Sequence, residues 1–143
     1  MAGLLVGSAC EEEASCEEDV RAQQLDERLT LQVGQEAAEV EVADDVTERE
    51  RGWMHRRCDR QGLLLVPDVP EPLPIWGCGL VDPVDLHFIR GDEVVDVVRD
   101  VEPCGMPCDA CPLHGEDVPV DAVVETLAGT LAADIGAPIR GLP

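Results

Sequence analysis

The stretch VDLHFIRGDEVVDVV, residues 84–98, decides the fold of this chain. Its first half largely alternates apolar and polar side chains, and its second half is rich in valine, so both halves favour β-strands. Arg90-Gly91-Asp92-Glu93 lies between the two halves, and such residues are typical of a tight turn. Residues 84–98 therefore predict an antiparallel β-hairpin.

Similar strand patterns occur on both sides of this hairpin. Residues 29–33 and 38–42 alternate around Gly34 and predict another hairpin. The four consecutive apolar residues 63–66 indicate a strand that is buried on both faces, and residues 122–127 predict one more strand. The prolines between residues 67 and 74 predict an extended loop that leads to Ile75-Trp76. Six to eight short strands are expected.

Two short helical segments complete the expected architecture. Thr47-Glu48-Arg49-Glu50 fits a capping box, which predicts a helix from there to about Arg56. Residues 130–135 predict one or two helical turns that end at Gly136. The fold class expected from the sequence is mainly β, a compact antiparallel barrel or sandwich with one or two short helices.

The composition limits the possible partners. The 143 residues include 31 carboxylates, ten arginines and no lysine, which gives a formal net charge of -21. This field repels phosphate backbones, so nucleic acid is excluded as a partner. No stretch approaches the ~20 apolar residues of a membrane-spanning helix.

The first 28 residues are interpreted as a leader remnant and a tether. Met1 to Ala9 is a short apolar run that ends at Cys10, as in a lipoprotein signal peptide, so Cys10 is the candidate lipidation site. Residues 11 to about 27 are acidic and predict a disordered spacer. Residues 29–143 then form a single β-rich domain, which is expected in the cell envelope or outside the cell.

The cysteines support an oxidising compartment. The chain has seven, and if Cys10 carries lipid, six remain to pair. Sequence alone leaves the pairing open, and the five disulfide candidates in the domain are Cys58, Cys78, Cys104, Cys108 and Cys111. An alternative is a zinc site made of Cys104, Cys108, Cys111 and His114. The same cysteine spacing holds iron–sulfur clusters in radical enzymes, but too few residues follow Cys111 to build their barrel.

The residue types that the domain lacks exclude several enzyme classes. The only serines are Ser8 and Ser15, in the leader and tether, so the domain has no serine nucleophile. Schiff-base chemistry is excluded because lysine is absent, and no phosphate-binding loop is found.

A shallow groove is the best site hypothesis. Trp76 follows the proline-rich loop and could form its floor. Asp85 and His87 are two residues apart on a strand, so they share one face. Arg51, Arg56 and Arg57 could offer a fork for anions. The structural alternatives are that Asp85 accepts backbone amides or pairs with an arginine, that the arginines form internal ion pairs, and that the tryptophans belong to the core.

Several of these motifs, taken in order, resemble the domain-of-unknown-function family numbered 192. The resemblance covers roughly residues 30–140 and rests on TERERGWMHR (47–56), GLLLV (62–66), Trp76, PVDLHFI (83–89), Cys104, Cys111-Pro112, Val124-Glu125 and LAG (127–129). It implies a compact β-rich fold, often secreted or lipid-anchored, without an established activity. The chain departs from the family at Gly77-Cys78-Gly79-Leu80, where the family usually has Met, a basic residue, Asn and Thr.

The sequence therefore predicts a monomeric binding or accessory module of the envelope, without enzymatic activity or cofactor. Its expected partner is a small molecule or an envelope protein. Two alternatives stay open. One is a thiol- or zinc-dependent enzyme that uses Cys78 or the loop from Cys104 to Cys111, and the other is a purely structural envelope component.

Overall fold

The hairpin expected at residues 84–98 is present as β6 (Val84–Arg90) and β7 (Glu93–Val101), which pair in antiparallel register. The computed structural model describes residues 16–58 and 62–143. The other elements are β1 (Arg28–Val33), β2 (Glu36–Ala43), α1 (Val46–Arg51), β3 (Gly62–Leu65), β4 (Glu71–Pro72), β5 (Ile75–Trp76), η1 (Cys108–Ala110), β8 (Leu113–His114), β9 (Pro119–Val120), β10 (Ala122–Leu127) and β11 (Ile139–Arg140).

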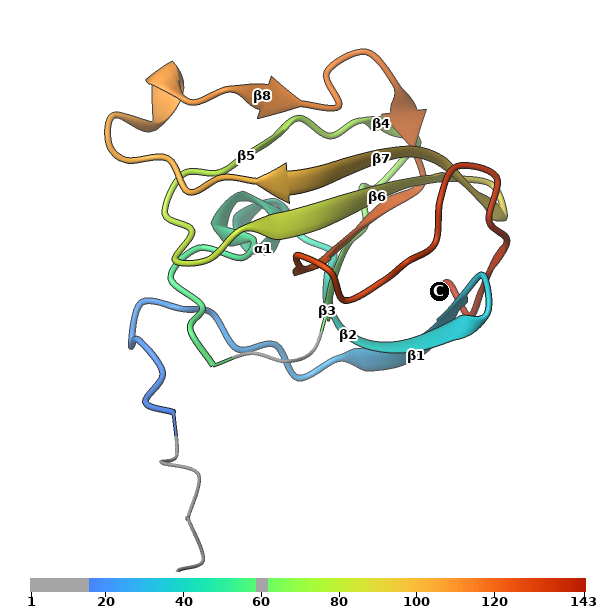
Figure 1. The fold of residues 1–143 in the computed structure, drawn as a ribbon, viewed down its shortest axis with the longest axis horizontal. Coiled ribbons are helices and arrows are strands. Elements are labelled where there is room, and N and C mark those ends of the chain that lie inside the picture. The colour runs from blue at the N-terminus through green and yellow to red at the C-terminus, as the bar shows by residue number, and fades with distance from the viewer. Residues whose placement is uncertain (1–15, 59–61) are drawn as a thin grey trace, which may run out of the picture.

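Seven strands form one sheet in the order β11-β1-β2-β3-β10-β6-β7. The sheet curls, so that β6 and β7 face β1 and β2 across the interior and the C-terminal segment runs through the opening (Figure 1). The two edges approach each other where Val94 N donates to Ala137 O at 2.9 Å and Ile139 N donates to Asp92 O at 2.8 Å. The expected β-rich fold is therefore confirmed as a curled, half-barrel sheet. One neighbour pair, β2 and β3, is parallel rather than antiparallel.

The sheet is covered on both faces. Leu64 and Val124 point into the curled interior with Leu31 and Val40. The residues next to them on the same strands, such as Leu63 and Val123, pack on the opposite face, together with Trp53, Ile75 and Phe88. Because side chains alternate along a strand, β3 and β10 are buried on both faces, as the apolar run 63–66 predicts. The second face is where α1, β5 and β8 pack, and it holds the candidate site.

Three local predictions differ from the structure. Asp45, not Thr47, caps α1: its side chain accepts from Glu48 N at 2.8 Å, and the Glu48 side chain accepts from Asp45 N, which completes a capping box two residues earlier than expected. The helix also ends at Arg51 rather than near Arg56. Residues 130–135 form no helical turn.

The segment 16–27 differs from the expected spacer because it lies against the domain. Gln23 is buried, and its Nε2 donates to the carbonyls of Glu48 and Gly52 at 2.8 and 2.9 Å. Leu25 N donates to a carboxylate oxygen of Glu41 at 2.7 Å. The acidic composition suggested disorder, but two glutamine hydrogen bonds and the Cys16–Cys58 disulfide connect the segment to the fold.

The described residues contain three disulfides, Cys16–Cys58, Cys78–Cys108 and Cys104–Cys111. They use all five cysteines expected in the domain, together with Cys16. Two of them fasten the loop of residues 102–112, whose Cys104 also forms a parallel bridge with Cys78. Disulfides of this number are typical of proteins in oxidising, extracytoplasmic environments. The candidate lipidation site, Cys10, lies outside the described residues.

Candidate ligand-binding pocket

A cavity of about 520 Å³ opens between α1, the chain from Leu73 to Leu80, and β8. Its walls are mostly apolar and include both tryptophans of the chain, Trp53 and Trp76. Trp53 is 2% exposed and follows α1, whereas Trp76 in β5 is 36% exposed at the mouth. Pockets for small ligands commonly have this volume and this mixture of apolar walls with a few polar groups.

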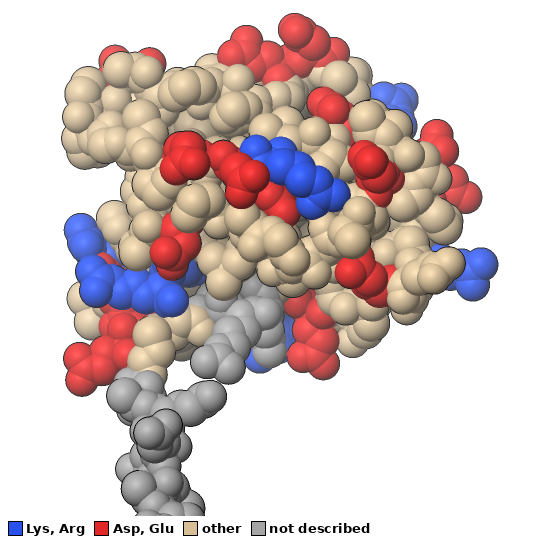
Figure 2. All heavy atoms as spheres, in the orientation of Figure 1, with Lys and Arg blue, Asp and Glu red and all other residues tan. Residues whose placement is uncertain are grey.

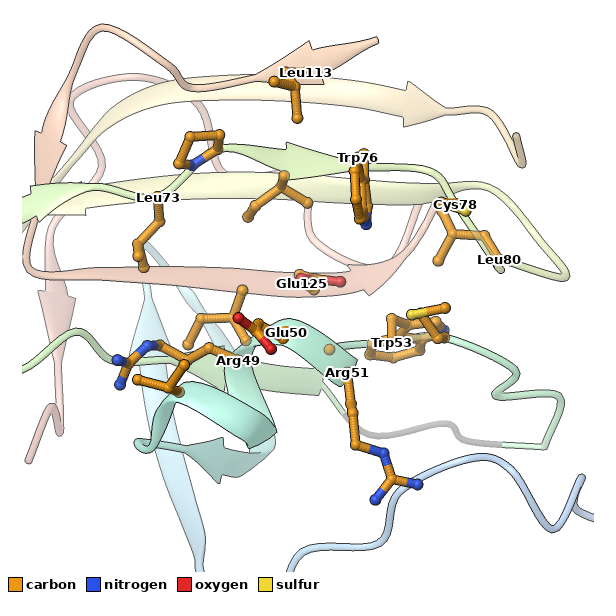
Figure 3. A pocket seen from close by; sticks show the side chains of 16 residues that line it. Arg49, Glu50, Arg51, Trp53, Leu73, Trp76, Cys78, Leu80, Leu113 and Glu125 are labelled. Atoms are coloured by element: carbon orange, nitrogen blue, oxygen red, sulfur yellow. The ribbon is translucent and has the colours of Figure 1, made fainter. Parts of the chain in front are cut away.

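Glu125 is the buried polar group of this pocket. In Figure 3 it lies between Trp76 above and α1 with Trp53 below. Glu125 lies on β10, on the same face as Val123, and is 3% exposed. Burial raises the pKa of Glu125 to about 7, against a weaker lowering by the positive charge of Arg56. Among the described residues, no hydrogen bond contributes to this shift.

The arginines that line the pocket use their guanidinium groups elsewhere. Arg49 Nη1 donates to the carbonyls of Asp44 and Val66, each at 2.9 Å. Arg51 Nη2 donates to Arg21 O at 3.0 Å, and Figure 3 shows its side chain directed away from the cavity. The carboxyl group of Glu125 therefore faces the cavity without a cation from α1 beside it.

Arg56, which the sequence suggested for an anion fork, is a buried structural residue. It forms an ion pair with Glu41 at 3.2 Å, in which both side chains are almost completely buried. Its guanidinium also lies 5.0 Å from the centre of the Trp53 ring, in cation–π contact. Arg56 thus packs behind the pocket wall formed by Trp53. This agrees with the structural alternative from the sequence, in which the arginines form internal ion pairs.

Asp85 and His87 do not join Trp76. Both side chains of β6 lie on the interior side of the sheet, whereas Leu86 and Phe88 face the side of the pocket. The carboxylate of Asp85 accepts from Arg99 Nη1 at 3.2 Å and from the amides of Asp100 and Gly129 at 2.9 Å. This is the structural alternative from the sequence, backbone amides plus an arginine.

His87 is fully buried, and its Nε2 lies 2.9 Å from Ala133 O. Burial lowers the pKa of His87. A neutral ring whose Nε2–H donates to Ala133 fits this geometry. The groove hypothesis therefore keeps Trp76 and Arg51 at the pocket but places Asp85, His87 and Arg56 outside it.

The zinc and thiol alternatives are not supported in the disulfide form. Cys108 pairs with Cys78, and Cys104 pairs with Cys111, so none of these sulfurs is a thiolate ligand or nucleophile. Within residues 16–58 and 62–143, no three His, Cys, Asp or Glu side chains group as a metal site. Cys78, two residues after Trp76, nevertheless lines the pocket.

Sequence reasoning missed Glu125 as a pocket residue. In the sequence, Glu125 stands out only as part of the strand 122–127 and of the Val124-Glu125 motif of the family resemblance. A signal was present, because Glu125 is the one charged residue in an apolar run that was expected to form a strand. A lone carboxylate in such a run is either paired or faces a cavity, and here it faces the cavity.

None of the helices in the described part of the chain is long and apolar enough to span a membrane. No match was found among curated proteins.

Two solved structures share the fold. One, from Sinorhizobium meliloti 1021, is described as a "putative transcription regulator"; it is 22% identical, with a TM-score of 0.72, over 83% of this chain and 97% of that one. The other, a protein of unknown function from Novosphingobium aromaticivorans DSM 12444, is 20% identical, with a TM-score of 0.66, over 79% and 83% of the two chains. At these identities the likeness shows the fold alone.

The profile of the DUF192 family, described as "Uncharacterized ACR", matches residues 29–137. Apart from Arg28 at the start of β1, this range contains every strand of the curled sheet except β11, and it contains the residues that line the pocket, from Val46 to Glu125. All the motifs that carry the resemblance in the sequence fall within it. The chain therefore belongs to the DUF192 family.

Proposed function

We propose that this protein is an exported binding domain that holds a small, partly apolar organic molecule between Trp53 and Trp76. The observation that carries the proposal is the cavity of about 520 Å³ with two tryptophans in its walls and the buried Glu125 facing it. Indole rings provide large apolar contact area, and one polar group in an apolar pocket fixes the orientation of a ligand.

The proposed compartment is the cell envelope or the extracellular space. The three disulfides support it, because such crosslinks persist outside the reducing cytoplasm. Lipid on Cys10 would anchor the domain to a membrane, so that the pocket works close to the envelope surface. In this view the protein acts as a monomeric binding or accessory module.

The binding proposal is testable with the two indole N–H signals of the ¹⁵N-labelled protein. The probe is 2-phenylethanol, a small neutral molecule with an aromatic ring. Both indole signals are expected to shift in a saturable way, and Trp76→Ala is expected to weaken binding about ten-fold or more, because it removes one wall. Val69→Ala, at an exposed apolar residue outside the pocket, serves as the control. Absence of saturable shifts at millimolar probe would overturn the proposal.

The compartment is tested by thiol alkylation of protein isolated from intact cells, followed by intact-mass measurement. Without reductant, Cys16, Cys58, Cys78, Cys104, Cys108 and Cys111 are expected to resist alkylation. With reductant, each disulfide opens two alkylation sites. An additional acyl mass on a chain that begins at Cys10 would support the anchor. A cytoplasmic form with every thiol free would contradict the proposed location.

A further inference from the structure

We propose that the natural ligand is a small organic ammonium ion whose charge is neutralised by the Glu125 carboxylate and whose apolar part lies between the two indole rings. This inference rests on the proposed function, since it names the ligand class of the same pocket. It starts from a geometric fact: a carboxyl group that is 3% exposed faces a largely apolar cavity.

Within residues 16–58 and 62–143, the arginines near Glu125 are engaged with other partners. The charged groups around it are Arg49, Glu50 and Arg51 of α1 and Arg56 behind Trp53. The guanidinium groups of Arg49 and Arg51 are bound to backbone carbonyls, as described above. Arg56 is ion-paired with Glu41. The strand neighbours of Glu125, Leu63 of β3 and Leu86 of β6, carry no charge.

An ammonium ion matches this arrangement in two ways. Its N–H groups donate to the carboxylate in a charge-assisted hydrogen bond, which is stronger than a neutral one. Its charge is also attracted to the faces of indole rings. The residue at the rim, Glu50, is acidic and adds to the attraction.

The whole molecule favours a cation as well. The chain carries a formal charge of -21, and Figure 2 shows acidic side chains distributed over the visible face with few arginines among them. Such a field raises the local concentration of cations and speeds their association. An organic anion would meet this field and the carboxyl groups of Glu50 and Glu125. An inorganic divalent ion would need several oxygen ligands, which the apolar walls do not provide.

Binding of the ammonium ion requires Glu125 to be ionised. In the free protein, burial raises the pKa of Glu125 to about 7, so the carboxyl group is largely protonated below that pH. The bound ammonium charge lowers the pKa again. Below pH 7 the proton therefore leaves Glu125 for the buffer as the ligand binds, and the ammonium ion keeps its own protons. Affinity for the amine rises with pH up to about pH 7 and then levels off.

The test compares three probes of similar shape, phenethylamine, 2-phenylethanol and phenylacetate, by isothermal titration at pH 8. Phenethylamine is expected to bind about ten-fold or more tightly than the other two, the usual size of a charge-assisted hydrogen bond. Glu125→Gln is expected to remove this preference and to leave the affinity for 2-phenylethanol within about two-fold. Glu39→Gln, which removes an exposed carboxylate outside the pocket, is expected to keep the preference.

Proton release provides a second readout. Titrations at pH 6 in buffers with different ionisation enthalpies are expected to report release of about one proton per bound phenethylamine in the wild type and none in Glu125→Gln. Equal affinities for all three probes, or tighter binding of phenylacetate, would overturn the ammonium inference but leave the binding proposal intact. Failure of every probe to bind would overturn both.

Discussion

Glu125 places a measurable pH dependence in the stability of the protein. The pKa of this group is raised by burial from its ordinary value of 4.5 to about 7 in the folded state. Between these values the folded state binds more protons than the unfolded state, so the group's contribution is favourable at low pH and is lost as pH rises through 7. The loss is on the order of 3 kcal/mol, since one pKa unit corresponds to about 1.4 kcal/mol.

The expected result concerns a difference between two proteins, because other carboxylates also titrate. The free energy of unfolding of Glu125→Gln minus that of the wild type should increase by on the order of 2–3 kcal/mol from pH 5 to pH 8. Urea titrations followed by tryptophan fluorescence measure it. The same difference for Glu39→Gln should stay nearly constant, and a flat profile for Glu125→Gln would show that the carboxyl group is not desolvated.

The roles of single residues were only partly predictable from the sequence. The spacing of Asp85 and His87 correctly implied a shared face, but sequence could not tell which face. That choice depends on the strands that pair with β6 and on the chain that fills the interior, where Ala133 O meets His87. Trp76 was identified because the preceding prolines restrict the backbone locally. For Arg56 the sequence left an anion fork and an internal ion pair open, because its partner Glu41 is distant in the sequence.

At the scale of elements, the N-terminal segment 16–27 binds to the end of α1 and stabilises it. Gln23 Nε2 donates to Glu48 O and Gly52 O, and these carbonyls lie at the end of the helix, where intrahelical donors run out. Gln23→Ala is expected to lower the free energy of unfolding by about 1–3 kcal/mol, because it removes the donor to the carbonyl of the buried Gly52, whereas Glu48 O keeps its bond from Gly52 N. Urea unfolding checks this, with the neighbouring exposed residue in Gln24→Ala as the control. Equal stability of the two variants would mean that the segment adds nothing.

The disulfide-fastened loop explains the departure from the family at residues 77–80. A Cβ atom on Gly77 would overlap with Glu102 O, and one on Gly79 would lie 2.8 Å from the Met54 side chain. The loop that begins near Glu102 is drawn over this segment by the Cys78–Cys108 disulfide. Gly77 therefore makes room for the loop and Gly79 for the Met54 side chain, which sequence alone could not show because these segments are far apart in the chain.

Gly77→Ala is accordingly expected to be destabilising by about 1–3 kcal/mol, the usual cost of forcing an extra carbon into a packed site. Gly105→Ala in the same loop is the matched control, because its added Cβ would meet no atom within 4 Å. Thermal unfolding of both variants under non-reducing conditions measures the effect. If Gly77→Ala and Gly105→Ala unfold at the same temperature, the backbone of the loop moves to accommodate the added carbon despite its two disulfides.

At the scale of the whole molecule, local sequence patterns predicted the fold class, but they did not predict how the sheet curls and its two edges meet. Alternating and continuous apolar runs predicted the strands, because a strand buried on one face alternates apolar and polar residues and a strand buried on both faces is apolar throughout. The parallel pairing of β2 with β3 and the contact between Val94 and Ala137 join distant segments. Neither leaves a local pattern. The residues around Glu125 also come from segments that are distant in the sequence. The pocket therefore could not be predicted from local patterns and is seen only in the structure.

The net charge of -21 also acts on the whole molecule. Like charges repel more strongly in the compact state than in the expanded unfolded chain, and salt screens that repulsion. Raising NaCl from 0.02 to 0.5 M at pH 7.5 is therefore expected to increase the free energy of unfolding by on the order of 1 kcal/mol. Urea titrations at the two concentrations measure the change. At pH 4.5, near the pI of about 4.1, the same step should have a smaller effect, because fewer carboxylates are ionised. A decrease with salt at pH 7.5 would mean that attractive ion pairs such as Arg56 with Glu41 outweigh the repulsion.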